Sequence, residues 1–126
     1  MEAEGGGIPT KLLQTYTWTG YRYYVGTTVS FTSTVTADEV LIVANLCSAS
    51  PSGESNGSIS AITSSNSSSE VTDIAYQHLY GGEEGHPRDG TRVVKMTNVK
   101  SGDSIRLTVN TLTRQTAICV FIIGED

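Results

Sequence analysis

The 126-residue chain is poor in charge and in the side chains that most enzymes use. Asp, Glu, Lys and Arg together make up 17% of it, and it has two histidines, two cysteines and three prolines. The 13 acidic residues outnumber the 8 basic ones, which gives a net charge of −5. An acidic chain lacks the basic surface that contacts phosphate groups, so nucleic acid and anionic membranes are unfavourable partners.

Long apolar runs are also missing. No stretch approaches the roughly 20 apolar residues of a membrane-spanning helix, and the start, MEAEGGGIPT, lacks the basic and apolar regions of a signal peptide. Residues 1–7 are acidic and glycine-rich, which predicts a flexible leader. Residues 8–126 then have the length of one domain.

Each of the two cysteines lies inside an apolar run. Cys47 ends VLIVANLC, and Cys119 lies within TAICVFIIG. We expect two buried free thiols that behave as small apolar side chains, with a disulfide between central strands as the alternative. Two isolated cysteines are too few for a zinc site, and no metal or cofactor is predicted.

Uncharged polar residues and short apolar segments make up most of the sequence. Apolar residues account for 37%, and much of the rest is Ser, Thr, Asn and Gly. Such a composition favours β-structure and an extracellular or virion-surface location. Apolar and polar residues alternate in KLLQTYTW (11–18), where Leu12 shares a face with Trp18, and in TTVSFTSTVT (27–36), which has one hydroxyl face.

Two segments are apolar on both faces. VLIVANLC (40–47) and TAICVFIIG (116–124) predict central strands that are buried on both sides and flanked by other strands. Shorter strands are expected at 59–63, 91–99 and 104–110. Half of residues 48–69 are serine, which predicts a segment that does not order itself firmly.

The segment EVTDIAYQHLY (70–80) fits two structures. Ser67 and Glu70 fit a helix capping box, but Ile74, Tyr76 and His78 alternate as on a strand. We predict a strand, because its surroundings are β. Strands with turns about every ten residues then predict an all-β fold, a single antiparallel β-sandwich of jelly-roll type.

The stretch HLYGGEEGHPRDG (78–90) contains both histidines and several acids. Such residues can bind a metal or carry out acid–base chemistry, but their spacing matches no metal or catalytic motif. Paired glycines, His-Pro and Asp-Gly are typical of a long loop between strands. We expect an exposed loop with His86, Arg88 and Asp89 as candidate ligand contacts.

Five of the nine aromatic residues cluster in TYTWTGYRYY (15–24). If exposed, they form a platform on which sugar rings stack, and a guanidinium adds forked hydrogen bonds. If covered, they belong to the core or to a subunit contact. The candidate contacts are Trp18, Tyr21, Arg22, Tyr23 and Tyr24.

The C-terminal third resembles the closing strands of C1q/TNF-like jelly rolls and of β-modules at the heads of bacteriophage fibres. The residues concerned are Val93–Val99, Gly102-Asp103, Ile105–Val109 and Ala117–Gly124 with Phe121. The resemblance implies a homotrimer whose terminal strands line the three-fold axis, ligand binding through loops, and no catalytic residues.

These observations predict a non-enzymatic module that binds a receptor protein or a glycan at the head of a phage-like or surface fibre. One alternative is a purely structural virion or appendage domain without a small ligand. A second is a small metal-dependent hydrolase that uses the His/Glu loop.

Overall fold

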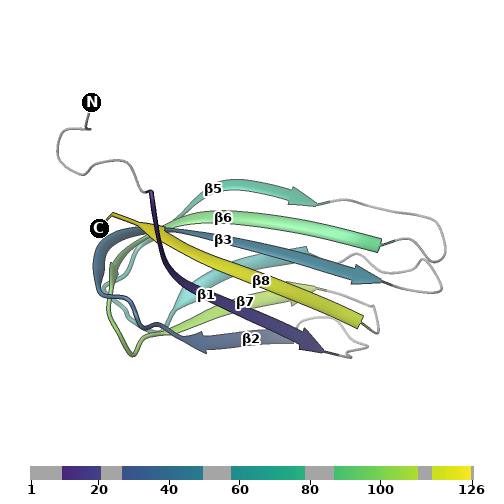
Figure 1. Cartoon of the computed structure of the whole chain (residues 1–126), viewed down its shortest axis with the longest axis horizontal. Helices are drawn as coiled ribbons and strands as arrows, with labels where there is room; N and C mark the ends of the chain where they lie inside the picture. The colour runs from purple at the N-terminus through teal and green to yellow at the C-terminus, as the bar shows by residue number, and fades with distance from the viewer. Residues whose placement is uncertain (1–9, 21–26, 50–57, 79–86, 111–114, 126) are drawn as a thin grey trace.

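The structure is a computed structural model of the chain, and it describes residues 10–20, 27–49, 58–78, 87–110 and 115–125. This part of the chain consists of β-strands joined by turns and short connections (Figure 1). The strands are β1 (Lys11–Gly20), β2 (Thr27–Thr32), β3 (Ala37–Ala49), β4 (Ser58–Ser64), β5 (Val71–His78), β6 (Pro87–Val99), β7 (Ser104–Asn110) and β8 (Gln115–Gly124).

The strands form two antiparallel sheets that pack face to face. The larger sheet has the order β1-β8-β3-β6-β5, and the smaller has the order β2-β7-β4. β1 pairs with β8, β2 with β7 and β3 with β6, which is the nested pairing of a jelly roll. β5 departs from that scheme, because it pairs with β6 instead of β4. The predicted all-β antiparallel sandwich is confirmed.

The core lies between the two sheets and is made of alternate residues of each strand. In the segment 27–36 every predicted inward residue is buried, including Phe31 and Val35, while the hydroxyl residues between them are exposed. The largest fully buried apolar side chains are Ile42, Leu46, Ile59, Met96, Ile105, Leu107, Ile118 and Ile122. The alternation of apolar and polar residues therefore correctly predicted which side of these strands faces the core.

β1 breaks the predicted alternation near its start. Its pairing with β8 shifts register between Leu12 and Gln14, as in a β-bulge. Leu13 consequently packs against the core, whereas Leu12 lies opposite Ile123 on the outer side and is 55% exposed. The prediction that Leu12 shares a face with Trp18 is wrong, because the extra residue reverses the alternation.

The described part of the serine-rich region, residues 58–69, is better ordered than predicted. Residues 58–64 form β4, a full member of the smaller sheet, and residues 71–78 form the predicted strand β5. Between them, the Asn66 amide nitrogen donates to the Asn98 carbonyl at 3.0 Å and to Asp103 Oδ2 at 3.1 Å. Its amide oxygen accepts from the Ser68 N–H at 2.9 Å. The hydrogen bonds of Asn66 therefore hold the turn between β4 and β5, which has no apolar side chains to bury.

Side chains connect the two sheets along both open sides. On one side, Gln14 of β1 donates to the Thr32 carbonyl at 3.0 Å and accepts from the Thr34 N–H at 2.9 Å. On the other side, Arg92 of β6 donates through Nε to the Ile59 carbonyl of β4 at 2.6 Å. These bonds occupy backbone groups at the sheet margins, which stabilises the edges of the sandwich.

Candidate functional site

The candidate site is the outer face of the larger sheet, which is the face turned away from the smaller sheet. Residues directly opposite each other in an antiparallel pair lie on the same face. Leu41 of β3 lies opposite Ile123 of β8, which in turn lies opposite Leu12 of β1. One row along, Val43 lies opposite Phe121 on one side and opposite Val93 of β6 on the other. We call the six residues Leu12, Leu41, Val43, Val93, Phe121 and Ile123 the apolar patch.

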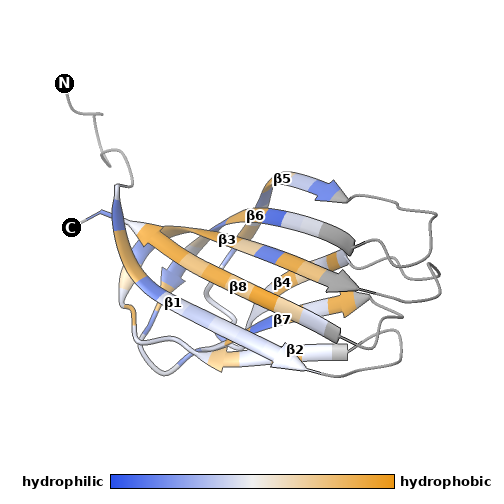
Figure 2. Cartoon of the chain, turned by 45° about the vertical axis from the view of Figure 1, so that its right-hand side comes forward, coloured by the Kyte–Doolittle hydropathy of each residue, from blue (hydrophilic) through white to orange (hydrophobic). Residues whose placement is uncertain are grey.

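The apolar patch is half-buried within the single chain. Leu41, Val43, Val93, Phe121 and Ile123 are of intermediate exposure, and Leu12 is largely exposed. Figure 2 shows that β8 and β3 are hydrophobic along most of their described length. A sheet face that meets water normally carries polar residues at alternate positions, and β3 and β8 lack that alternation.

The outer face of the smaller sheet has the opposite character. There Thr28 lies opposite Thr108, and Ser30 lies opposite Arg106. Thr63 of β4 faces Arg106 from the other side. The two outer faces of one sandwich therefore differ in chemistry: one is rich in hydroxyl groups, and the other is apolar. The contrast makes the apolar face the candidate surface for a contact with protein.

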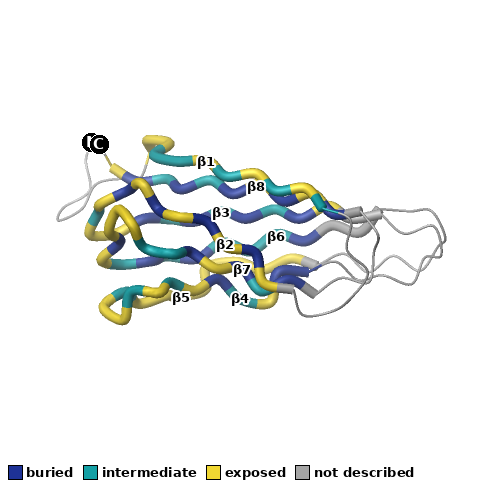
Figure 3. The backbone as a smooth tube through the Cα atoms, turned by 90° about the horizontal axis from the view of Figure 1, so that it is seen from below, coloured by how far each residue is buried: buried dark blue, intermediate teal, exposed yellow. Residues whose placement is uncertain are grey.

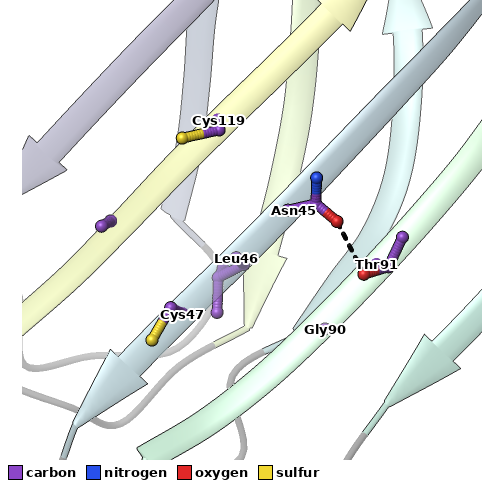
Figure 4. A pocket seen from close by; sticks show the side chains of 7 residues that line it. Asn45, Leu46, Cys47, Gly90, Thr91 and Cys119 are labelled. Atoms are coloured by element: carbon purple, nitrogen blue, oxygen red, sulfur yellow. Dashed lines mark hydrogen bonds between the residues drawn. The ribbon is translucent and has the colours of Figure 1, made fainter.

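Next to the apolar patch, the same face has a hollow of about 350 Å³ (Figure 4). Its lining comes from three adjacent strands: Asn45, Leu46, Cys47, Gly90, Thr91, Ala117 and Cys119. The Thr91 hydroxyl donates to Asn45 Oδ1 at 2.8 Å across β6 and β3. The small residue Ala117 lies opposite Cys47 on this face, where a larger side chain would fill the space, whereas Gly90 lies opposite the inward-facing Leu46.

Both cysteines lie in this hollow. Neither is in a disulfide, as predicted, but both are exposed, so the prediction of buried thiols is wrong. Cys47 and Cys119 lie on the outward-facing sides of β3 and β8. Their neighbours in the sequence, Leu46 and Val120, lie on the inward-facing sides and are buried. The prediction that these strands are buried on both faces is wrong for the single chain for the same reason: the larger sheet has a second sheet on one side alone.

The aromatic cluster is described in part. Trp18 is half-buried and packs against the core, with its ring over Gly20, where a Cβ atom would overlap the indole. Tyr16 stacks on Phe31 with ring centroids 4.6 Å apart. Tyr21, Arg22, Tyr23 and Tyr24 lie outside the described residues, as does the predicted leader 1–7. Their roles remain predictions.

The predicted loop 78–90 is shorter than expected. β6 begins at Pro87, and the backbone of residues 87–90 pairs with β3. Arg88 and Asp89 are therefore strand residues, although their side chains lie outside the described set, and so does His86. The start of β6 was missed because Pro and Asp-Gly are turn formers, while pairing with the long central strand β3 overrides that preference.

Within the described ranges, no group of three or more His, Cys, Asp or Glu side chains converges as a metal site would require. None of the described elements is a helix long and apolar enough to cross a membrane.

No protein-family model matches the chain, and no curated protein matches it significantly. Among solved structures, it is similar to the tripod (BppUct-A-L) from the baseplate of bacteriophage Tuc2009, with a TM-score of 0.45 and 18% sequence identity. The match covers 87% of this chain and 64% of that one, so the chain spans under two thirds of that protein's length.

Proposed function

We propose that this chain is a non-enzymatic binding module that associates with copies of itself through the outer face of the larger sheet. The observation that carries the proposal is the apolar patch on a sandwich whose other outer face is hydroxyl-rich. Exposed contiguous apolar surface of this kind is uncommon on monomeric proteins and is typical of protein–protein contacts.

A second copy is a suitable partner for the patch, because its centre is uncharged. The nearest described charged groups on the face, Lys95 and Glu39, lie at its margin and form an ion pair at 3.8 Å. Two chains with a net charge of −5 can therefore bring these faces together without opposing like charges at the centre. The surrounding threonines of β1, Thr15 and Thr17, form a polar rim.

The size of the face also fits self-association. Strands lie about 4.8 Å apart and rise about 3.4 Å per residue, so four strands over seven residues span roughly 20 by 24 Å. That is about 500 Å², made up of the apolar patch, the hollow and the polar rim, and the rest of the five-stranded face enlarges it toward the roughly 800 Å² per partner of a stable interface. We propose a homotrimer, the assembly implied by the resemblance in the C-terminal third.

Recognition of a receptor or glycan is proposed for the opposite end of the strands from the chain termini. β1, β3, β5 and β7 end there, and β2, β4, β6 and β8 begin there (Figure 1). The segments with the predicted contacts Tyr21, Arg22, Tyr23, Tyr24 and His86 are thus attached at a single end. Several weak sites on one assembly would bind cooperatively to a surface through avidity, as at the head of a phage-like or surface fibre.

Light scattering coupled to size-exclusion chromatography tests self-association. We expect a trimeric mass at micromolar concentration and a lower mass for Val43→Ser, which makes the patch polar, with Thr28→Ser on the other outer face as the matched control. A monomeric wild-type chain would disprove the proposal. A glycan array with Trp18→Ala and Tyr23→Ala variants tests recognition separately. No binding would indicate a structural domain without a small ligand, and binding that both changes leave unaltered would overturn the aromatic cluster as the contact.

A further inference from the structure

β5 is an edge strand whose side chains are exposed on both faces. It is the last strand of the larger sheet and pairs with β6 along one edge. Residues 71–77 are all exposed (Figure 3). Of the four exposed large apolar side chains in the described part of the chain, three belong to β5: Val71 at 39%, Ile74 at 56% and Tyr76 at 47%. Exposed apolar edge strands are templates for pairing with another chain.

At the other sheet margins, a side chain forms hydrogen bonds with backbone groups. Gln14 connects β1 to the end of β2, and Arg92 donates a hydrogen bond to the Ile59 carbonyl of β4. Natural sheets block their edges in such ways to prevent unwanted strand pairing. β5 differs from these three strands, because it exposes three large apolar side chains, whereas β1 exposes one, Leu12, and the described residues of β2 and β4 expose none.

Ile74 is the most exposed of these side chains, and its backbone position explains why. In the β5–β6 ladder, Asp73 pairs with Val94 and Ala75 with Val93, so Ile74 is the extra residue of a β-bulge. A bulged residue has no opposite partner in the ladder. Ile74 therefore lies in the middle of β5 with a side chain that is 56% exposed.

The charge on β5 is compensated within the chain. Asp73 is the sole charged residue between positions 71 and 77. Its Oδ1 accepts from Arg92 at 2.9 Å, and the same guanidinium lies 4.2 Å from the ring centroid of Tyr76. Two copies of β5 can therefore approach each other without an uncompensated charge on either strand.

We propose that β5 pairs antiparallel with β5 of a second copy about a two-fold axis at Ile74. In that register Ile74 meets its own counterpart, Asp73 lies opposite Ala75, and Thr72 lies opposite Tyr76. Such a contact is isologous, so each strand supplies the same groups to the other. The two carboxylates are then diagonal neighbours about 7–8 Å apart, and each keeps its own arginine.

The contact is too small to hold a dimer alone. An eight-residue strand is about 27 Å long, and pairing through its edge covers well under the roughly 800 Å² per partner of a stable interface. It would instead join oligomers already assembled through the apolar patch, where several weak contacts act together. This joining role rests on the proposed self-association, whereas the strand pairing itself does not.

Disulfide cross-linking of the full chain tests the pairing. In a Cys47→Ala, Cys119→Ala background, Ile74→Cys places two thiols opposite each other across the axis, where Cα atoms about 4.5–5.5 Å apart permit a disulfide. The matched control is Ser30→Cys on the exposed hydroxyl face of the smaller sheet. Each protein is oxidised with copper–phenanthroline and air, and covalent dimer is measured by non-reducing electrophoresis.

We expect several-fold more dimer from Ile74→Cys than from Ser30→Cys. When Phe121→Ser disrupts the apolar patch, the total yield should fall, but Ile74→Cys should still give more dimer than Ser30→Cys. Equal yields from the two positions would overturn the β5 pairing. The Phe121→Ser variants cannot assemble through the patch. The comparison in these variants therefore still tests the β5 pairing if the proposed self-association is wrong. A second variant, Ile74→Lys, keeps the fold but places two charges at the axis, and it should lower the mass at high concentration relative to Ile74→Val.

Discussion

Substitution of Phe121 by serine is the sharpest single perturbation of the apolar patch. Phe121 lies at the middle of the face, opposite Val43 of β3 and Thr15 of β1, and it is half-buried in the single chain. Because its backbone belongs to a central strand and its side chain faces outward, serine should preserve the sheet while it removes apolar surface from the proposed interface.

The size of the effect follows from the area that remains to be covered. A phenylalanine side chain has about 200 Å² to bury. For a half-buried ring such as Phe121, an area on the order of 50 Å² remains to be covered, which at about 25 cal/mol per Å² corresponds to about 1 kcal/mol per copy. An interface that buries the side chain of two copies loses about 2 kcal/mol. We therefore expect the dissociation constant for self-association to rise about thirtyfold.

Sedimentation velocity over a concentration series measures that constant directly. Thr28→Ser serves as the control, since it lies on the hydroxyl face and should leave the constant unchanged. Urea unfolding of both variants verifies that the monomer is still folded. If Phe121→Ser and the wild-type chain dissociate over the same concentration range, the outer face of the larger sheet is not the interface.

Other substitutions test individual contacts of the fold. Gly20→Ala forces the ring of Trp18 to move, so we expect an altered tryptophan emission spectrum and a loss of about 1–3 kcal/mol in unfolding free energy. Gln14→Leu removes the two hydrogen bonds that connect β1 to the end of β2 and should cost about 2 kcal/mol in urea unfolding. Gly102 has a φ of +101°, so Gly102→Ala should lower the melting temperature through about 1–2 kcal/mol of backbone strain. Lys95→Met should change the unfolding free energy by less than about 1 kcal/mol, because its ion pair is exposed.

The sequence predicted the strands well because most of them have one face in the core. Alternation identified β2 and β7, and unbroken apolar runs identified β3 and β8 as central strands. The strand interpretation of residues 71–78 was correct because tertiary pairing with β6 outweighs a local capping signal.

Two of the errors have a common physical origin in contacts that no local pattern encodes. The bulge at Leu13 reverses a face, and the hydrogen bonds of Asn66 order a serine-rich turn. The exposure of Cys47 and Cys119 was missed for a different reason. An apolar strand face looks the same in sequence whether its own chain or a second copy covers it.

The two thiols provide the most direct test of the central claim, which is that copies of the chain cover the outer face of the larger sheet. Cys47 and Cys119 lie beside the apolar patch and are exposed in the single chain, so they can report on its coverage. The measurement is the rate at which a thiol reagent modifies them, in wild-type protein and in Phe121→Ser at equal concentration. The account predicts slow modification of the wild type that accelerates on dilution, and fast modification of Phe121→Ser at every concentration. Equal and concentration-independent rates in both proteins would contradict it.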